Sequence, residues 1–414
     1  MRVDELRGKR IAIWGWGREG RAALRFLRAR MPGVALTIFD DADTVDADDV
    51  SMVLGRAAIV AVITDFDLVV KSPGISLYDP LVVEAQARGV RFTSLLNLWF
   101  ADDPTAYTIC VTGTKGKSTT AALIDHILRG TGRNVALAGN IGVPVTELPR
   151  EGLDYAVIEV SSYQAADFVG TCDIAVLTML AQEHLDWHGS VEVYQRDKLN
   201  LLRHARQAVV NADARGAAAD LPTVCYFDPR ADLSVSNNYL SRAHNQSNLS
   251  AALAIADLIG IDRAAALRAA EDFRSLPHRQ QEIGEIDGVL YVDDSISTTP
   301  ESAVAAMEVY RDRAVTIIIG GQDRGIDYQI LVDRIRATPP CAVVLLDASG
   351  MRIANELGSV GGVHVVQSMR EAVDVARRVT PRGGVVLLSP AAPSYGSYRN
   401  FIERGCDFAR CVGL

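Results

Sequence analysis

Short apolar stretches alternate with amphipathic stretches along the whole chain, and glycine-rich or polar turns follow many of the apolar ones. An apolar, β-branched run predicts a buried strand, and apolar residues at helical spacing predict a helix. Strands that alternate with helices are typical of a mostly parallel sheet, whose ligands bind at the carboxyl ends of the strands. We therefore expect an α/β protein with three domains, at residues 1–103, 104–277 and 278–414.

The clearest motif opens the second segment. Residues 108–111 predict a strand, a turn with Gly113 and Gly116 follows, and a helical pattern continues from Thr119. This order directs backbone N–H groups and the positive end of a helix at one spot, which predicts a phosphate site. Lys117 would supply charge to the terminal phosphates, and the Ser118 hydroxyl would reach Mg²⁺. A full P-loop has a glycine where this chain has valine at position 111, but the flanking strand and helix argue against a chance turn.

A second glycine motif stands near the start. The run 15–20, Gly-Trp-Gly-Arg-Glu-Gly, lies between a predicted strand at 10–14 and a predicted helix at 22–30, and Asp40 ends the next strand. The glycines permit a diphosphate to approach a helix start, and Asp40 is placed to accept from a ribose hydroxyl or a base. NAD is the obvious ligand, although another nucleotide diphosphate would use the same geometry. The turn Ser72-Pro73-Gly74, after another strand, could line the same crevice.

Polar side chains also follow later strands of the second segment. Glu159, at the end of the strand predicted at 155–161, is a natural Mg²⁺ ligand beside a phosphate loop. His184 and His188 are one helical turn apart, so a zinc pair is conceivable, but no thiolate or matched carboxylate accompanies them. By position alone Lys198 is an ordinary surface lysine.

Asn245 and Asn248 precede an alanine-rich helix. They could read a base edge, or simply cap the helix, and capping is the default interpretation. The third segment has strands predicted at 289–292, 315–319, 343–346, 363–366 and 385–388, with helices such as 301–309 and 372–379. This pattern indicates a second doubly wound domain without a glycine fingerprint, which suggests a closing lid that brings a second substrate.

Composition narrows the class of protein. The net charge is -9, with 51 acidic against 42 basic residues, so a nucleic-acid partner has no electrostatic support. The six cysteines are scattered without metal-ligand spacing, which fits a reducing cytoplasm. The charged start lacks the apolar core of a signal peptide, and no apolar run approaches the roughly 18 residues of a membrane span. We expect a cytoplasmic protein, and a monomer.

Several motifs taken together resemble the Mur ligases, enzymes that build the peptidoglycan stem peptide. They come in the family's order across the whole chain: 113–119, 139–144, 159–164, 183–186, Lys198, 244–248, 276–279 and 293–295. The resemblance implies a Rossmann-like N-terminal domain, a central P-loop ATPase with a mostly parallel sheet and a Rossmann-like C-terminal domain. It also implies ATP and Mg²⁺ as cofactors, and a role in cell wall biogenesis, cell shape and cell division.

Within the family, the first segment and the tail at 388–401 resemble the branch that adds glutamate to UDP-N-acetylmuramoyl-L-alanine. A UDP-sugar therefore displaces NAD as the expected N-terminal ligand. The family reaction implied is phosphorylation of the alanyl carboxylate by ATP, followed by attack of the glutamate amine on the acyl phosphate. The alternatives are another Mur-type or folate-type amino-acid ligase, an NAD-dependent oxidoreductase with an accessory ATPase, and a nucleotide-dependent regulatory protein.

The resemblance also assigns residue roles. The ATP site would comprise Gly113, Thr114, Lys115, Gly116, Lys117, Ser118, Thr119, Asn245, Asn248, Arg279 and Asp294. The UDP-sugar site would comprise Gly15, Gly17, Arg18, Glu19, Asp40, Ser72, Pro73, Gly74, Asn140, Ser161 and Gln164. Glutamate would lie among Thr298, Arg324, Ser394 and Phe401. The metal ligands would be Ser118, Glu159, His184 and a carbamylated Lys198, and the catalytic residues Lys117, Asn140, His184 and Lys198.

Two departures from the family pattern touch the amino-acid pocket. Ile296 stands where many relatives of this branch have lysine, and Arg324 replaces another lysine with a planar, bidentate carboxylate binder. The span between Asn211 and His244 also looks short. A variant branch of the family takes L-glutamate in place of D-glutamate and relies on a later epimerase. The sequence leaves both enantiomers open.

Overall fold

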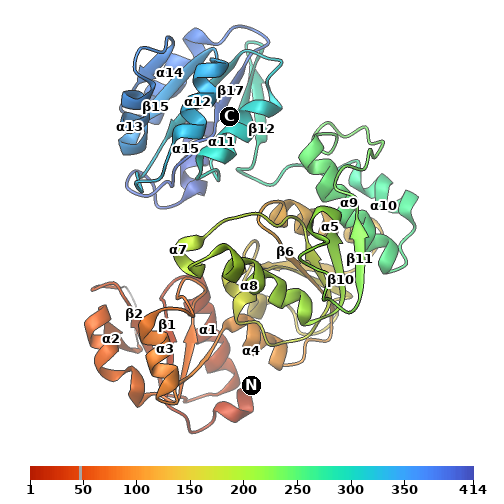
Figure 1. Cartoon of the computed structure of the whole chain (residues 1–414), viewed down its shortest axis with the longest axis vertical. Coiled ribbons are helices and arrows are strands. Elements are labelled where there is room, and N and C mark those ends of the chain that lie inside the picture. The colour runs from red at the N-terminus through yellow and green to blue at the C-terminus, as the bar shows by residue number, and fades with distance from the viewer. Residues whose placement is uncertain (46–48) are drawn as a thin grey trace. The chain divides into compact units, whose positions relative to one another are not determined.

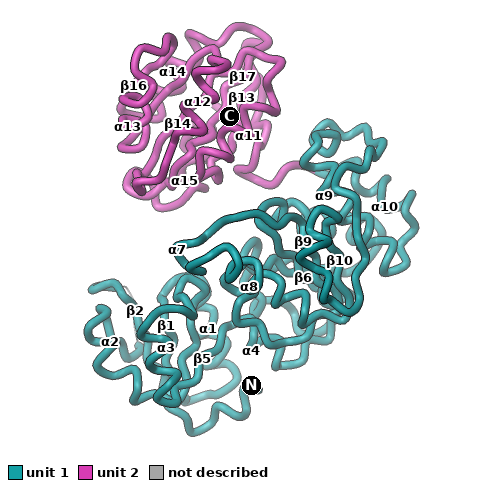
Figure 2. Tube along the Cα trace, viewed as in Figure 1, with its two compact units in different colours: residues 1–273 teal, residues 274–414 magenta. Residues whose placement is uncertain are grey.

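The computed structural model describes residues 1–45 and 49–414 (Figure 1). The chain forms two compact units, residues 1–273 and residues 274–414, which are described separately (Figure 2). The first unit holds two sheets and the second unit holds one.

The N-terminal sheet has the strand order β3-β2-β1-β4-β5, and its neighbouring strands pair in parallel. Its two faces are packed by separate apolar clusters, because strands buried on both sides carry apolar residues at successive positions. The strands are β1 (Ile11–Trp14), β2 (Leu36–Asp40), β3 (Ser51–Leu54), β4 (Leu68–Lys71) and β5 (Arg91–Thr93). The helices are α1 (Arg18–Arg30), α2 (Arg56–Val62), α3 (Pro80–Ala87) and α4 (Leu95–Ala101).

The central sheet has the order β11-β10-β9-β6-β8-β7 and is also parallel throughout its recorded pairings. Its strands are β6 (Tyr107–Thr112), β7 (Val135–Gly139), β8 (Tyr155–Glu159), β9 (Cys172–Leu177), β10 (Ala205–Asn211) and β11 (Val224–Phe227). Its helices are α5 (Lys117–Gly130), α6 (Ser162–Ala166), α7 (Leu185–His188), α8 (Val191–Arg203), α9 (Ala243–Leu258) and α10 (Arg263–Ala270). The carboxyl ends of β6, β8 and β9 are adjacent at one edge, so the turns that follow them share one site.

The second unit is built on a sheet of order β12-β13-β17-β14-β15-β16, in which only the β12–β13 pair is antiparallel among the described pairings. Its strands are β12 (Gln281–Ile286), β13 (Val289–Asp293), β14 (Val315–Gly320), β15 (Ala342–Leu346), β16 (Val363–Val365) and β17 (Val385–Leu388). Its helices are α11 (Pro300–Val309), α12 (Gln329–Ala337), α13 (Asp347–Leu357), α14 (Met369–Val379) and α15 (Phe401–Val412). Two apolar clusters, one on each face, form its core.

The α/β fold expected from the sequence is confirmed, including the mostly parallel sheets. The strands expected at 289–292 and 385–388 are found within one residue of those bounds. Helices begin earlier than expected: α1 starts at Arg18 and α5 at Lys117, so both glycine motifs lead directly into a helix. Within the described residues no helix has both the length and the apolar character needed to cross a bilayer.

Candidate active site

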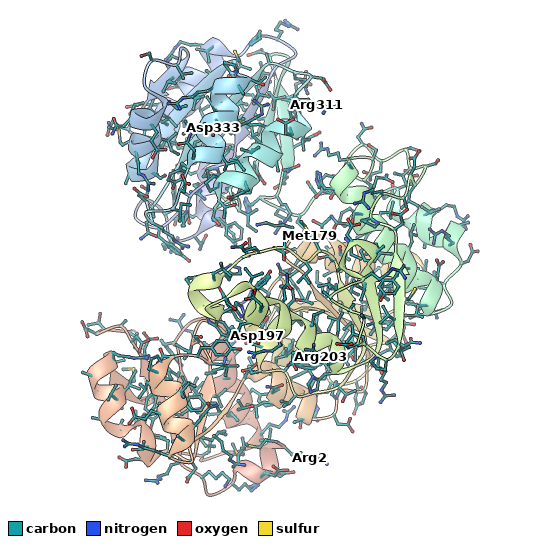
Figure 3. All side chains as sticks on the ribbon, in the orientation of Figure 1. Arg2, Met179, Asp197, Arg203, Arg311 and Asp333 are labelled. Carbon is teal, nitrogen blue, oxygen red and sulfur yellow. The ribbon has the colours of Figure 1, made fainter. Side chains whose placement is uncertain are left out.

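The phosphate loop between β6 and α5 is hydrogen-bonded to the turn that follows β9. Gly116 precedes α5 in a left-handed conformation, with a φ of 86°. A Cβ on Gly113 would lie 2.0 Å from the Thr178 hydroxyl oxygen, so only glycine fits there. The Thr178 hydroxyl donates to the Lys115 carbonyl at 2.6 Å, and the Thr114 amide donates to the Met179 carbonyl at 2.8 Å (Met179 is labelled in Figure 3).

Both lysines of the phosphate loop, Lys115 and Lys117, contact oxygen atoms of the protein. Lys117 Nζ donates to the carbonyls of Gly113 and Thr114 at 2.8 and 2.9 Å, so the ammonium group is curled over its own loop. Lys115 Nζ lies 2.6 Å from a carboxylate oxygen of Glu183, which belongs to the segment after β9. Both ammonium groups therefore stand where negative phosphate oxygens could replace carbonyl and carboxylate oxygens.

Glu159 is a buried carboxylate with one oxygen unsatisfied. It ends β8, and 1% of its surface is exposed. Its Oε1 accepts a hydrogen bond from Asn140 Nδ2 at 2.7 Å, while Oε2 has no hydrogen-bond partner. Because an unpaired buried carboxylate oxygen is costly, this atom indicates a missing cation or donor.

Lys198 is the most buried cation of this edge, and the interpretation as an ordinary surface lysine is wrong. One per cent of its surface is exposed, and Nζ donates to the Gly113 carbonyl at 2.9 Å. Burial, reinforced by the positive charge of Lys117, holds the pKa of Lys198 well below its usual range. The structure thus places an amine that is easily deprotonated under the phosphate loop.

His184 and His188 do not form a metal pair. His184 precedes α7 with a φ of 55°, and burial lowers the pKa of its imidazole, an effect that the neighbouring Glu183 opposes. His188 is buried, with Nδ1 2.8 Å from Asp197 and Nε2 3.1 Å from the Ser162 hydroxyl, so both ring nitrogens are engaged. The zinc interpretation is therefore wrong, and in the described chain no three His, Cys, Asp or Glu side chains group as metal ligands.

Asp197 was not singled out by the sequence. It precedes Lys198 on α8 (labelled in Figure 3) and also accepts from the Tyr78 hydroxyl at 2.7 Å, a residue that follows the Ser72-Pro73-Gly74 turn. Trp187 Nε1 donates to the Gly74 carbonyl at 3.3 Å. These contacts join the N-terminal sheet to the helix that carries Lys198.

Asn245 and Asn248 lie inside α9, so the capping interpretation is wrong. Both side chains are buried. Asn248 Oδ1 accepts from the Thr120 hydroxyl at 3.1 Å, and a Cβ on Gly116 would lie 2.5 Å from that same oxygen. Asn248 thus lies against the phosphate loop, and its Nδ2 donates to Asn245 Oδ1 at 3.1 Å.

The N-terminal glycine turn is closed by Asp40 and Ser72. Asp40 accepts from the amides of Trp16 and Ala42 at 2.7 and 3.0 Å, which fixes its carboxylate at the mouth of the turn. The Ser72 hydroxyl donates to the Gly15 carbonyl at 3.0 Å. Burial raises the pKa of Glu19, although Arg18 partly offsets this effect.

Three other residues expected at the UDP-sugar site have structural partners. Ser161 caps α6 through a capping box with Gln164, whose side chain is buried. The Arg18 guanidinium donates to three backbone carbonyls in the turn after β7, at Gly139, Asn140 and Gly142.

In the second unit the residues expected to bind glutamate follow adjacent strands. Thr298 comes after β13, Arg324 after β14 and Ser394 after β17, while Phe401 begins α15. Because β13, β17 and β14 are neighbours in that order, their carboxyl ends gather these residues at one edge. Arg279 and Asp294 also belong to this unit.

Arg404 is buried and donates hydrogen bonds to backbone carbonyls at or after the ends of these strands. The sequence did not predict this role. Arg404 is 1% exposed, and its guanidinium donates to the carbonyls of Ser295, Gly320 and Ala392 at 2.8 to 3.1 Å. Burial lowers the pKa of Arg404 to about 10. A lone arginine in α15 carries no sequence signal, because only the fold brings the three carbonyls together.

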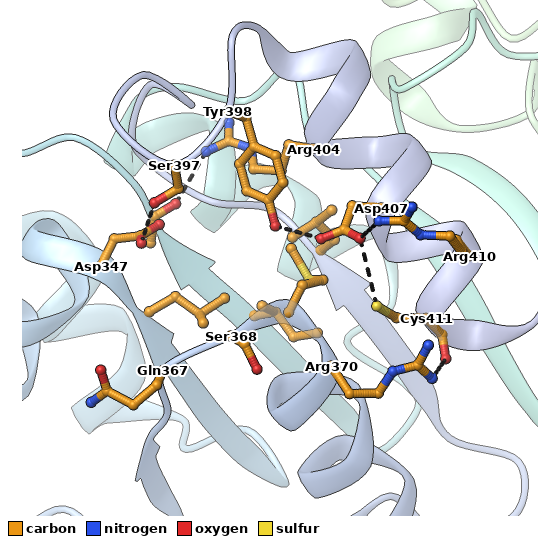
Figure 4. A pocket seen from close by; sticks show the side chains of 15 residues that line it. Asp347, Gln367, Ser368, Arg370, Ser397, Tyr398, Arg404, Asp407, Arg410 and Cys411 are labelled. Carbon is orange, nitrogen blue, oxygen red and sulfur yellow. Dashed lines mark hydrogen bonds and ion pairs between the residues drawn. The ribbon is translucent and has the colours of Figure 1, made fainter.

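Arg404 also borders a cleft of about 500 Å³ beside α14 and α15 (Figure 4). Several of its polar side chains are hydrogen-bonded within the cleft. Asp407 accepts from Tyr398 at 2.7 Å and pairs with Arg410, and Arg370 donates to the Cys411 carbonyl at 3.0 Å. None of the four residues expected to bind glutamate lines this cleft.

Three family matches cover the three sheets in order. The Mur ligase MurD-like N-terminal domain matches residues 9–94, the Mur ligase middle domain residues 111–226, and the Mur ligase glutamate ligase domain residues 278–392. A protein of Xanthomonas euvesicatoria pv. vesicatoria named UDP-N-acetylmuramoyl-L-alanine--L-glutamate ligase is 41% identical over 100% of this chain and 97% of its own length. The chain belongs to the Mur ligase family.

Other Mur ligases extend the comparison. A protein of Salinispora tropica with the same name is 40% identical over 100% of this chain and 99% of its own length. The crystal structure of MurC from Thermotoga maritima superposes with a TM-score of 0.61 at 18% identity, covering 98% of this chain and 99% of that one. MurF from Acinetobacter baumannii gives 0.62 at 17% identity, covering 99% and 92%.

Membership fixes the class of reaction. The chain is an ATP-dependent ligase that forms a peptide bond in peptidoglycan precursor synthesis. The expected three-domain Mur ligase fold is confirmed.

Proposed function

We propose that this ligase joins L-glutamate to UDP-N-acetylmuramoyl-L-alanine through an acyl-phosphate intermediate. The observation that carries the proposal is the full-length identity of about two residues in five to relatives that bear this name in three genera. We assign the UDP-sugar to residues 1–103, ATP to residues 104–277 and the amino acid to residues 278–414. The enzyme acts in the cytoplasm as a monomer.

ATP binds at the phosphate loop. Lys115, Lys117 and the amides at the start of α5 provide positive charge for the β- and γ-phosphates, and Ser118 is the first hydroxyl of the helix. We assign Asn245 and Asn248 to the adenine side, and we also assign Arg279 and Asp294 to ATP.

The residues around Glu159 fit a Mg²⁺ ion. Glu159 Oε2 is a buried oxygen without a partner, and Mg²⁺ is usually held by one or two carboxylates plus phosphate oxygens. The other protein ligands that we assign are Ser118, His184 and a carbamylated Lys198. Bound there, the ion would neutralise charge on the transferring phosphoryl group.

Lys198 acts as a carbamate. The buried position favours the neutral amine, which is the form that attacks CO₂ to make an N–C bond with release of a proton. The product is a carboxylate at the end of a long side chain, close to the Gly113 carbonyl and to Glu159. It would supply a further carboxylate beside Glu159.

The proposed reaction takes place in two steps, phosphoryl transfer and then amide formation. The alanyl carboxylate attacks the γ-phosphorus and ADP leaves, with Lys117 and Asn140 beside the reacting groups. The glutamate amine attacks the acyl carbon and gives up a proton, an amide bond forms, and phosphate leaves with the electron pair of the broken C–O bond. Thr298, Arg324, Ser394 and Phe401 hold glutamate, and Arg324 supplies a planar fork for one of its carboxylates.

The test is product formation by the purified enzyme with Mg²⁺-ATP, UDP-N-acetylmuramoyl-L-alanine and either L- or D-glutamate, followed by mass spectrometry. We expect a product carrying one added glutamate with the L form, and phosphate release that needs both acceptor and amino acid. A product with D-glutamate alone would reverse the assigned stereochemistry. Phosphate release that is indifferent to either substrate would refute ligation.

A further inference from the structure

Arg18 links the two sheets of the first unit at the point where their functional turns meet. It is the first residue of α1 and directly follows the glycine turn after β1. Its Nη2 donates to the carbonyls of Gly139 and Asn140 at 2.8 and 3.1 Å, and its Nη1 donates to the Gly142 carbonyl at 3.1 Å. All three acceptors lie in the turn after β7, in the central sheet.

This turn needs a cation. Its conformation depends on glycine: Gly139 and Gly142 have φ values of 103° and 71°, and a Cβ on Gly139 would lie 2.2 Å from the Glu159 carbonyl oxygen. The tight turn directs three carbonyl oxygens at one point, where their negative ends repel one another. A guanidinium group offsets that repulsion, because its planar fork donates several hydrogen bonds at once.

The same turn carries Asn140, which contacts Glu159 twice. The Asn140 backbone amide donates to the Glu159 carbonyl at 2.9 Å, and its side-chain Nδ2 donates to Oε1 at 2.7 Å. This second bond orients the carboxylate so that Oε2 is the unsatisfied oxygen. Three residues, Arg18, Asn140 and Glu159, therefore connect the sugar-nucleotide turn with the phosphoryl-transfer site.

We propose that Arg18 is a positioning residue for phosphoryl transfer, which acts through the 139–142 turn and Asn140 on Glu159. The inference rests on the proposed function and changes the role of Arg18 from a contact with the UDP-sugar to a residue that connects the two sheets of the first unit. It follows that loss of Arg18 slows turnover more than it weakens binding of the sugar nucleotide.

The test compares Arg18→Ala and Arg18→Lys with Arg25→Ala. Arg25 lies on the same helix and pairs with Glu147 of the central region, so this control removes a second α1 cation without touching the 139–142 turn. For Arg18→Ala we expect kcat for phosphate release to fall tenfold or more, with KM for the sugar nucleotide within about threefold of wild type. Arg18→Lys should recover part of the loss, since an ammonium group reaches fewer of the carbonyls, and Arg25→Ala should keep kcat.

Hydrogen exchange supplies a readout that is independent of catalysis. The backbone amides of Gly139 and Asn140 donate hydrogen bonds to the carbonyls of Val143 and Glu159. If Arg18 holds this turn, both amides should exchange faster in Arg18→Ala and at the wild-type rate in Arg25→Ala. Unaltered exchange in Arg18→Ala, or a raised KM with wild-type kcat, would overturn the proposal and return Arg18 to direct binding of the UDP-sugar. If the wild-type enzyme made no peptide bond, the proposed function would fail while the exchange data would still decide whether Arg18 holds the turn.

Discussion

Asp294 is a buried carboxyl group whose ionisation opposes folding of the second unit. It is 3% exposed, and its oxygens accept hydrogen bonds from the Gln280 amide and from the hydroxyls of Ser297 and Ser389, at 3.1, 2.6 and 2.8 Å. Burial raises the pKa of Asp294 from 3.8 to about 6, although these hydrogen bonds and the charge of Arg279 pull it down. The folded pKa thus lies above the unfolded one.

The sign and size of the pH effect follow from this difference. Between pH 3.8 and pH 6 the folded state binds more protons than the unfolded state, so the free energy of unfolding decreases as pH rises. Each pKa unit of difference between the folded and unfolded states is worth about 1.4 kcal/mol. The shift from 3.8 to about 6 therefore lowers the free energy of unfolding by about 3 kcal/mol in total. About half of it, roughly 1.4 kcal/mol, develops between pH 5 and pH 8, because part of the loss has already occurred below pH 5.

The assay compares wild type with Asp294→Asn in the full-length protein. Asparagine keeps the shape and cannot ionise, so the variant should gain about 1.4 kcal/mol relative to wild type between pH 5 and pH 8. Protection factors of the buried amides in β13 and β17 measure this difference at each pH. Asp312→Asn is the control, since the Asp312 side chain is 93% exposed and its replacement should leave the difference constant.

A constant difference between wild type and Asp294→Asn from pH 5 to pH 8 would refute the reasoning. A difference of the opposite sign would mean that the folded unit prefers the ionised carboxylate, and that Arg279 outweighs burial.

Three further outcomes follow from the described contacts. Lys198→Ala should lose phosphate release and regain part of it with added formate or acetate, and wild-type turnover in that variant would contradict a carbamate at this position. Asn140→Ala removes the hydrogen bond from Asn140 Nδ2 to the Glu159 carboxylate, a bond worth about 1.5–3 kcal/mol, so kcat should fall about tenfold to a hundredfold. An unchanged kcat would show that Glu159 keeps its orientation without this hydrogen bond. Arg404→Lys should lower the thermal unfolding midpoint, because one ammonium group cannot donate to all three strand-end carbonyls. An equal midpoint would show that water molecules replace the lost hydrogen bonds.

Local patterns in the sequence were sufficient for the inner strands of each sheet and for the phosphate loop, but they did not predict β3, β5, β11 or β12. The run 108–111, the glycines at 113 and 116 and the helical pattern after them specify a strand, a turn and a helix without help from the rest of the chain. The same is true of strands such as β17, which are buried on both faces and therefore apolar at successive positions. The assignment of Glu159 to a strand end was likewise readable from its neighbours.

Contacts between distant segments could not be read in this way. Lys198 looks like a surface residue in its helix, and only the packing of α8 under the loop buries it. Asn248 precedes an apolar stretch, as a helix cap would, but α9 begins earlier and turns its side chain toward Thr120. Arg18 and Arg404 act on carbonyl groups, which carry no sequence signal at all.

The most direct measurement follows the oxygen atoms of the alanyl carboxylate. Supplied with UDP-N-acetylmuramoyl-L-alanine labelled with heavy oxygen at that carboxylate, the enzyme should release phosphate that carries one labelled oxygen for each L-glutamate joined. Unlabelled phosphate alongside a new peptide bond would contradict activation of the carboxylate by phosphoryl transfer.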